Sequence, residues 1–348
     1  MRILRRMLDG VGDARQIAAP DREISPGERW RHFLAHGDFS LAYAAATETY
    51  LKSFGDARGF IAYGQKSGHT FALGDPLSEA ADAAGLLADF VATFRDPVFV
   101  AVDGATATLL AARGYRINAF GADAVVDLAG HTFAGGQGKA IRYATSWAAA
   151  NGFTLAERAI GAFDREAIAG IDRRWRGTRV NSRRELLFLN RRFTIGEEPG
   201  VRRFFALDAQ GRPVAFISFD PLSRDGRTTG YLASTKRREP EGSTYLDLAL
   251  MRHAIDVFRG EGLETCRLGL SPLAGLQPSP WPDDRAVRLV LARAGRSAWV
   301  NRRVFNFEGL AAYKARFRGR ELPHFLALPP DGRNVLRLVS MLRLMRLV

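Results

Sequence analysis

Residues 304–317 have the sequence VFNFEGLAAYKARF, in which a short aromatic run, a glycine and a basic amphipathic turn follow one another directly. A second distinctive stretch, CRLGLSPL at residues 266–273, is typical of a strand that ends in a turn. This combination is not a generic core pattern, so the two stretches are the first candidates for a functional region. The alternative is that both are ordinary buried strand and helix starts.

The length and composition of the chain indicate a packed protein of more than one domain. A chain of 348 residues is too long for one typical core. Hydrophobic residues make up 47% and charged residues 25%, the balance of a packed soluble protein. The single cysteine, Cys266, excludes a disulfide framework and indicates a reducing compartment. We expect Cys266 to be a small buried side chain rather than a nucleophile.

The chain is strongly basic. It has 50 Lys and Arg against 37 Asp and Glu, which gives a formal charge of +13. Most of the excess is Arg, whose planar guanidinium suits phosphate recognition. A field of this sign attracts RNA, anionic lipid or nucleotide-bearing cofactors. Solubility, or a coding bias toward Arg, is the alternative.

Apolar strand patterns alternate with helical patterns along the chain, which predicts an α/β fold with a mostly central sheet. A glycine-rich loop at 135–138 marks a break, and the order of strands and helices before it recurs in outline after it. The predicted organisation is a basic N-terminal lead-in at 1–40, a first domain at 41–134, a linker of glycine-rich loop and basic helix at 135–150, a second, catalytic domain at 151–328 and an amphipathic C-terminal helix at 329–348.

A candidate anion site lies in the second domain, where a strand at 230–233 runs into a basic loop and then a helix beginning at Thr244. Free amides and the positive end of a helix face the same point in such a layout. The layout resembles the pyrophosphate loop of the GCN5-related N-acetyltransferase (GNAT) fold. It has one glycine where that loop has two, which weakens a coenzyme A interpretation. The candidate residues for binding donor phosphates here are Lys236, Arg237, Gly242 and Ser243.

Lys139 and Arg142 lie on the first turn of the predicted linker helix. Cations there oppose the helix dipole, so their presence indicates another task. We expect them to hold phosphates of the donor, and a solvated helix face is the alternative.

The two opening stretches resemble the C-terminal catalytic region of the MprF family, the tRNA-dependent aminoacyl-phosphatidylglycerol synthases. That region carries an N-L/M-G-M-A-P-L-S strand and an F-N-F-x-G-L-x-x-Y/F-K-x-K-F helix entry. The resemblance extends over residues 45–328. It includes, in order, LGDP at 73–76, GYR at 114–116, VDL at 126–128, Lys139 with Arg142, Trp175 with Glu185, VAF at 214–216 and Gly242 with Asp247.

The resemblance implies two tandem GNAT-like units joined by a basic helix, with aminoacyl-tRNA as donor and an anionic phospholipid such as phosphatidylglycerol as acceptor. One departure concerns residues 232–237, which read LASTKR where the family carries an Asp-Leu-Met-Arg segment. The basic end of that segment is present and the Asp is missing. The amino acid and the acceptor therefore stay unassigned.

Transfer of an aminoacyl group from an ester to an alcohol depends on orientation and oxyanion stabilisation more than on covalent help. Asp247 and Glu185 are the candidate catalytic carboxylates, because either can orient the substrate amine or accept a proton. Ser271 is a candidate for hydrogen bonding to the acceptor. The alternatives are a helix-dipole acid for Asp247 and a surface acid for Glu185.

Other kinds of site have no signature in the sequence. The six histidines lack metal-ligand spacing, so we expect no metal and no cofactor. A G-x-S-x-G elbow, a P-loop and a dinucleotide fingerprint do not occur.

Membrane association is predicted to be peripheral. No apolar run approaches the ~20 residues that span a bilayer, and the basic start at 1–8 has no apolar signal segment after it. We therefore expect a cytoplasmic protein, peripheral on the inner face of the plasma membrane. The basic and apolar pattern of residues 333–348 predicts a helix in the membrane interface, with Arg333, Arg337 and Arg343 toward lipid. Docking of this helix on the protein's own core is the alternative.

The hypothesis is thus an aminoacyl-tRNA-dependent transferase that acts on a membrane lipid. An acyl-CoA-dependent N-acyltransferase of the GNAT superfamily is the leading rival. A non-catalytic module that binds RNA or anionic lipid is the third interpretation. The multi-pass flippase segment of the family is not in this sequence, so we expect any lipid product to stay in the inner leaflet or to be moved by another protein.

Overall fold

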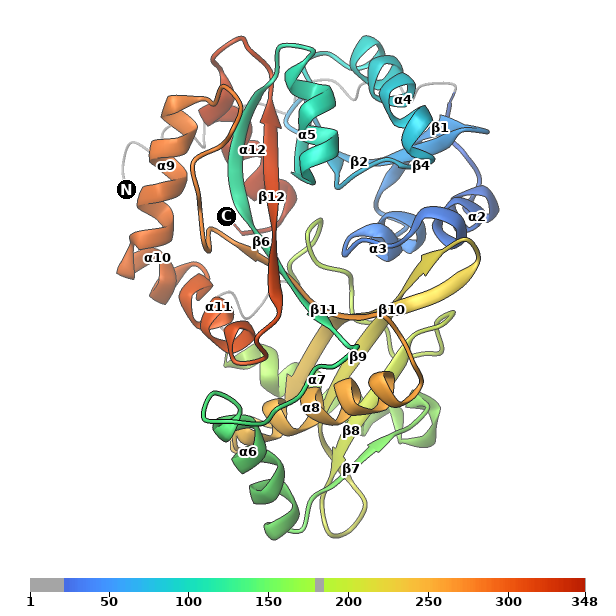
Figure 1. The fold of residues 1–348 in the computed structure, drawn as a ribbon, viewed down its shortest axis with the longest axis vertical. Coiled ribbons are helices and arrows are strands. Elements are labelled where there is room, and N and C mark those ends of the chain that lie inside the picture. The colour runs from blue at the N-terminus through green and yellow to red at the C-terminus, as the bar shows by residue number, and fades with distance from the viewer. Residues whose placement is uncertain (1–21, 179–184, 348) are drawn as a thin grey trace.

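The computed structural model of the chain describes residues 22–178 and 185–347. Over these residues one mixed sheet runs through the molecule in the order β1-β2-β3-β5-β12-β6-β11-β10-β9-β8-β7, and β4 pairs with β2 (Figure 1). Helices cover both of its faces. This architecture confirms the predicted α/β fold class.

The elements fall into an upper half, a lower half and a C-terminal part (Figure 1). The upper half contains α2 (Pro26–His36), α3 (Ala42–Thr47), β1 (Lys52–Asp56), β2 (Gly59–Lys66), β3 (His69–Leu73), β4 (Leu77–Ser78), α4 (Ala80–Thr93), β5 (Val98–Val102), α5 (Gly104–Ala111) and β6 (Arg116–Asp127). The lower half contains α6 (Lys139–Ala150), β7 (Thr154–Glu157), the short 3-10 helix η1 (Ile160–Ala162), α7 (Arg165–Gly177), β8 (Arg202–Leu207), β9 (Pro213–Arg224), β10 (Arg227–Arg238), α8 (Tyr245–Gly260) and β11 (Thr265–Pro272). The C-terminal part contains α9 (Arg285–Arg296), α10 (Ala298–Arg303), α11 (Phe307–Ala315), β12 (Arg320–Leu328) and α12 (Asn334–Leu344).

The same unit occurs in both halves. A helix joins two parallel strands in β3-α4-β5 and again in β10-α8-β11, and antiparallel strands precede each unit. Parallel neighbours need such a crossover connection because the end of the first strand and the start of the second lie at opposite ends of the strand pair. The repeat is the tandem GNAT-like arrangement that the sequence predicted.

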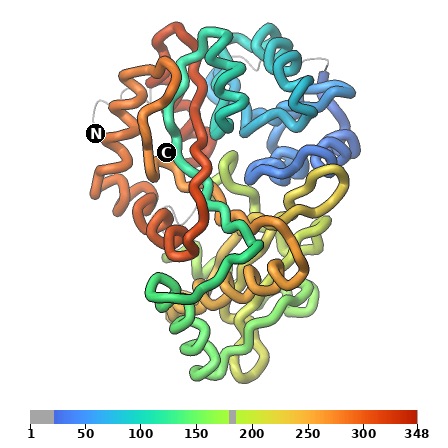
Figure 2. The backbone as a smooth tube through the Cα atoms, viewed as in Figure 1, coloured from blue at the N-terminus to red at the C-terminus, as the bar shows by residue number. Residues whose placement is uncertain are grey.

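The two halves exchange strands. β6 follows the helix α5 of the upper half but pairs with β11 of the lower half, and β12 inserts between β5 and β6. Figure 2 shows β6 running from the upper half toward the lower half, with β12 running beside it in the opposite direction. Residues 320–328, predicted as the end of the second domain, therefore complete the sheet of the first. The predicted domain boundaries divide the sequence, but the sheet is continuous across them.

Alternation along the strands explains how one sheet buries two layers of helices. In β8, Phe204 packs with α6 and α8, whereas the next residue, Phe205, packs with Ile168 and Ile171 of α7. Successive side chains of a strand point to opposite faces. In the upper half, α4 and α5 cover one face, and α2, α3 and α12 cover the other.

The helix α2 lies within the predicted lead-in, of which residues 1–21 are outside the described part. Its start is fixed by a capping box, in which the Ser25 hydroxyl accepts from the Glu28 amide and the Glu28 carboxylate accepts from the Ser25 amide. Pro26 occupies the first helical position, where its missing amide proton costs nothing.

The C-terminal helix α12 belongs to the core. Leu338, Met341 and Met345 join the cluster that α2, α3 and β3 also line. Arg337, predicted to contact lipid, is buried and pairs with Asp331 at 2.7 Å and with Asp96 at 3.5 Å.

The predicted lipid contact is therefore wrong at Arg337, and the polar Ser340 one turn later is buried as well. Arg333 is exposed and Arg343 is half-buried. The helix is docked on the protein's own core, as the alternative interpretation expected. No helix within residues 22–178 and 185–347 is long and apolar enough to cross a membrane.

We predict that Leu338→Ala lowers the free energy of unfolding by about 2–5 kcal/mol, because it removes buried methyl groups and leaves a cavity. Thermal unfolding followed by circular dichroism measures the change. Val335→Ala, at an exposed position of the same helix, is the matched control and should stay within about 0.5 kcal/mol of wild type. If Leu338→Ala and wild type melted at the same temperature, the assignment of α12 to the core would be wrong.

Candidate active site

The lower sheet opens where β10 and β11 separate. These parallel strands pair only at residues 230–232 with 265–267, as in a fork between two strands. β10 shifts register against β9 near Ser234, and β11 shifts register against β6 between Arg267 and Leu270. Gly269 lies in the second shift with φ +81°, a conformation that favours glycine. Ser271 is buried just beyond it, opposite Ala122.

Asp247 lies in the first turn of α8, at the mouth of this fork. Its carboxylate is flanked by Lys236 Nζ at 3.4 Å and Arg238 Nε at 3.6 Å. The 3.6 Å separation is too long for a hydrogen bond, and the buried Oδ1 accepts none from the described residues. Lys236 Nζ also lies 3.5 Å from the centroid of the Tyr313 ring. Asp247 thus has one carboxylate oxygen without a hydrogen bond and lies between two cations.

The helix α11 closes the fork. The Tyr313 hydroxyl donates to the backbone oxygen of Asp247 at 3.2 Å. The neighbouring Lys314 ammonium donates to the carbonyl oxygens of Gly269 at 2.6 Å and Leu270 at 2.9 Å. The stretch 304–317 and the stretch 266–273 therefore meet in space, and Lys314 fixes the irregular backbone of β11.

A second buried group of charges joins the halves beside the fork. Asp123 of β6 is completely buried and accepts a hydrogen bond from the Ser40 hydroxyl. Arg267 of β11 lies 3.5 Å from Asp123 Oδ2 and donates to the backbone oxygen of Asp38 at 2.8 Å. Asp123 Oδ1 is buried and makes no hydrogen bond within the described residues. Asp123 and three charged residues of the fork, namely Lys236, Asp247 and Lys314, are together called the junction cluster.

Lys236 and Arg237, predicted to bind the same donor, lie on opposite faces of β10. The structure extends β10 to Arg238, so neighbouring side chains alternate. Arg237 Nε binds Asp172 Oδ1 at 2.6 Å, and its guanidinium lies 4.2 Å from the Trp175 ring centroid. Its partners are therefore those of α7, away from Asp247.

Glu185 is on the Arg237 side as well. Its Oε1 accepts from the amide of Phe193 at 2.8 Å, and the Phe193 ring packs 5.8 Å from the Arg237 guanidinium. The structure does not bring Glu185 to Asp247, so the two predicted carboxylates do not form a pair.

The loop after β10 is closed on itself. Arg238 donates to the carbonyl oxygens of Glu239 and Gly242, and the Gly242 amide donates to Glu239 at 3.0 Å. The Ser243 hydroxyl accepts from the amide of Tyr245 at 3.2 Å. Gly242 and Ser243 thus shape the turn, and the amides of Gly242 and Tyr245 are engaged inside it instead of forming the predicted anion cradle.

The linker helix α6 packs against α8 in the lower core. Lys139 is exposed at its start, whereas Arg142 donates to the carbonyl oxygens of Phe133 and Gly135 and so holds the preceding loop. Tyr143 is 53% exposed, and its ring meets the Tyr245 ring edge-on at 5.1 Å. An exposed ring therefore lies next to the first residue of α8, and the exposed Lys139 lies one turn earlier on α6.

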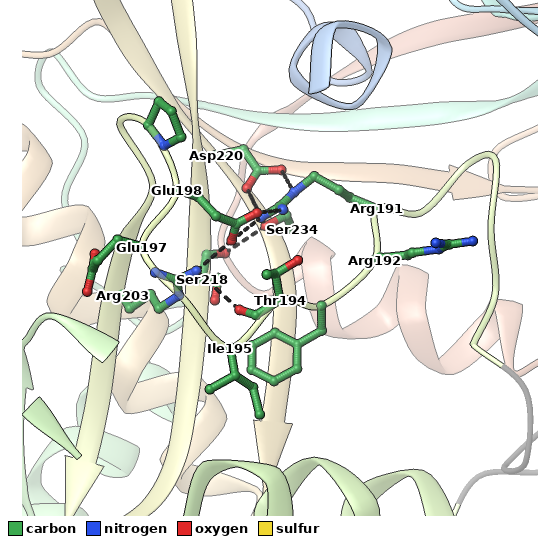
Figure 3. A network of polar contacts seen from close by, with 12 residues as sticks. Arg191, Arg192, Thr194, Ile195, Glu197, Glu198, Arg203, Ser218, Asp220 and Ser234 are labelled. Atoms are coloured by element: carbon green, nitrogen blue, oxygen red, sulfur yellow. Dashed lines mark hydrogen bonds and ion pairs between the residues drawn. The ribbon is translucent and has the colours of Figure 1, made fainter. Parts of the chain in front are cut away.

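A buried network stiffens the other side of the fork (Figure 3). Arg191 binds Asp220 of β9 through hydrogen bonds of 2.9 and 3.0 Å and also pairs with Glu198. Glu198 accepts from Arg203 at 2.6 Å, and Ser234 donates to Asp220 at 2.8 Å. The register shift in β10 thus turns Ser234 toward this network.

The loop that carries Arg191 also contacts the upper half. The Arg191 guanidinium lies 5.2 Å from the Tyr43 ring, and the Tyr43 hydroxyl donates to the carbonyl of Pro199 at 3.1 Å. The Glu48 carboxylate accepts from the Arg192 amide at 2.8 Å. The loop therefore ties both halves to the wall of the fork.

The family profile described as "Phosphatidylglycerol lysyltransferase, C-terminal" matches residues 30–328, which include both halves and the junction cluster. The chain belongs to this family. It is a phosphatidylglycerol lysyltransferase-like transferase, and the match confirms the resemblance predicted from the two stretches. A comparison with curated proteins found no match.

Solved structures share the fold of this family member. The structure of L-PGS from Bacillus licheniformis is 17% identical, with a TM-score of 0.75 over 94% of this chain and 99% of that chain. The C-terminal domain (DUF2156) of a putative lysylphosphatidylglycerol synthetase from Agrobacterium fabrum is 20% identical, with a TM-score of 0.72 over 92% and 98%. FemX is 10% identical, with a TM-score of 0.55 over 91% and 98%.

Sequence reasoning missed several members of the site. Asp123 and Arg267 are single charges inside apolar strands, and that pattern is the available signal for them. Lys314 stands in the family motif itself, but its contact with Gly269 depends on the fold. Over the described parts of the chain, no group of His, Cys, Asp and Glu side chains is arranged to hold a metal ion.

Burial lowers the pKa of Lys314 to about 8, against the attraction of Asp123 and with the repulsion of Lys236. The unfolded chain, in which this lysine titrates near 10.5, binds more protons than the folded chain between about pH 8 and 10.5. Stability should therefore rise with pH across this window, by up to about 1.4 kcal/mol per pH unit.

We predict that Lys314→Met flattens this rise, as measured by urea unfolding at several pH values. Lys66→Met, at an exposed lysine of β2, is the control and should keep the wild-type slope. A Lys314→Met slope equal to that of wild type would contradict the assignment.

Proposed function

We propose that this transferase moves the aminoacyl group of an aminoacyl-tRNA to a hydroxyl of an anionic phospholipid such as phosphatidylglycerol. The observation that carries the proposal is Asp247, a carboxylate between Lys236 and Arg238 at the head of α8 whose Oδ1 accepts no hydrogen bond within the described residues. An aminoacyl ester has an ammonium group that needs such an acceptor, whereas an acetyl group has none. Membership of the lysyltransferase family agrees with this donor.

The reaction needs no redox partner. The lipid hydroxyl oxygen bonds to the ester carbonyl carbon, the bond from that carbon to the ribose oxygen breaks, and the lipid hydroxyl proton passes to the ribose oxygen. In this scheme Asp247 orients the donor through its ammonium, which places the carbonyl for attack. The nearby charges of Lys236 and Arg238 favour the oxyanion. Ser271 is proposed to hydrogen-bond the acceptor.

The contacts of the loop after β10 disfavour acyl-CoA, the leading rival. A pyrophosphate cradle needs free amides, whereas this loop uses Arg238 and the Gly242 amide internally and carries the acids Glu239 and Glu241. Lys139 and Tyr143 offer a charge and an exposed ring beside α8, which suit the phosphates and bases of a single-stranded acceptor end.

The acceptor places the enzyme at a membrane. We propose that the protein works as a peripheral protein on the inner face of the plasma membrane, where anionic phospholipid and charged tRNA are both present. The third interpretation, a module that binds RNA or anionic lipid without turnover, differs by forming no aminoacyl lipid.

The donor prediction is tested by lipid product analysis. Purified protein with charged tRNA and phosphatidylglycerol should yield an aminoacyl lipid resolved by mass, and ribonuclease should abolish it. Binding to tRNA should weaken steeply with salt, because phosphate contacts release counterions. Product formation that survives ribonuclease and rises with acetyl-CoA would transfer the assignment to the acyl-CoA class.

We predict that Asp247→Asn lowers turnover by ~10²-fold or more, because the neutral amide no longer attracts the donor ammonium. Asp172→Asn, at a buried aspartate on the opposite face of the sheet, is the matched control and should affect turnover much less. Circular dichroism and melting temperature establish that both variants fold. Wild-type turnover in folded Asp247→Asn would assign the residue to the helix start alone.

A further inference from the structure

The helices α9 and α10 present large apolar side chains to solvent. Leu289 and Val290 of α9 are 47% and 43% exposed, and Trp299 of α10 is 56% exposed. On the opposite side of α9, Val287 and Leu291 are buried in the core. The helix is therefore anchored by one apolar face while it shows further apolar groups on the other. A purely structural helix needs only the buried face.

The same surface is strongly basic. Six arginines lie on the two helices, and residues 285–307 contain no Asp or Glu. The six arginines are Arg285, Arg288, Arg293, Arg296, Arg302 and Arg303, and all are exposed. Among the described residues, Arg288 alone of these makes an ion pair, with Asp283 at 2.9 Å.

This surface continues onto the start of α12. The Asn334 side chain donates to Asp284 Oδ2 at 2.8 Å, which ties the start of α12 to the start of α9. Arg333, Val335 and Leu336 are exposed beside this contact. The three exposed residues have the same mixed basic and apolar character as the outer surface of α9.

We propose that the exposed face of α9 and α10 docks on an anionic phospholipid bilayer, an inference that rests on the proposed lipid acceptor. A bilayer surface supplies both partners that the face needs: phosphates for the arginines and an acyl boundary for Trp299, Leu289 and Val290. Nucleic acid would satisfy the arginines but would leave Leu289 and Val290 in water.

The docking face is connected to the reacting centre through one short helix. Figure 1 shows α9, α10 and α11 in succession along one side of the molecule. α11 contributes Tyr313 and Lys314, which contact the head of α8 and the irregular part of β11. Along the chain, α11 alone therefore separates the docking face from the fork that contains Asp247.

The test uses the full chain and sedimentation with phosphatidylcholine vesicles, with and without phosphatidylglycerol. Each arginine at an anionic surface contributes about fivefold, or ~1 kcal/mol. The double charge reversal R293E/R296E should therefore weaken binding to phosphatidylglycerol vesicles by about 25-fold or more, and Trp299→Ala should weaken it as well. R158E/R227E reverses two exposed arginines elsewhere and should bind as wild type does.

Turnover separates this inference from the proposed function. R293E/R296E should lose activity on vesicles and keep it on a water-soluble short-chain phosphatidylglycerol. Vesicle binding that is unchanged in both face variants overturns the docking face, even if the wild type is an active transferase. Loss of RNA binding without loss of vesicle binding also overturns it. If the wild type makes no aminoacyl lipid but its vesicle binding depends on the face, the docking inference stands and the proposed function fails.

Discussion

The backbone ladder of β12 is the constraint on which the rest of the molecule depends. This strand hydrogen-bonds to β5 on one side and to β6 on the other, while β6 also pairs with β11. Because α11 immediately precedes β12, the ladder also fixes where Tyr313 and Lys314 meet the fork. The junction cluster is therefore positioned by main-chain hydrogen bonds, and its charges add specificity to a frame that already exists.

Sequence patterns report local features of the chain, which explains which parts of the structure could be predicted and which could not. The alternation of strands and helices, and the acid in the first turn of α8, are local features, so the fold class and the position of Asp247 were accessible. A loop that begins after residue 233 puts Lys236 and Arg237 at one site, whereas β10 continues to Arg238 and alternates their faces. The burial of Arg337 could not be predicted, because the pattern of one helix does not reveal a partner as distant in sequence as Asp96.

The arginines of this basic chain include two groups with different surroundings in the structure. Arg191, Arg203, Arg267 and Arg337 are buried, and each lies against carboxylates inside the protein. Such pairs add little net stability, since burying both charges costs about as much as their attraction returns. The exposed arginines of α9 and α10 form the other population. The composition counts all arginines together, and the fold distinguishes the buried group from the exposed group.

The exchanged strands also set the order in which the chain can fold during synthesis. β5 and β6 are complete early, but their shared neighbour β12 is encoded after the whole lower half. Until residue 328 has been made, β5 keeps an open edge, which is a template for pairing with other chains. Domains usually fold one after another as they leave the ribosome. Here the sheet of the first half cannot be completed until the last strand is available, so the nascent first half carries an unpaired strand edge.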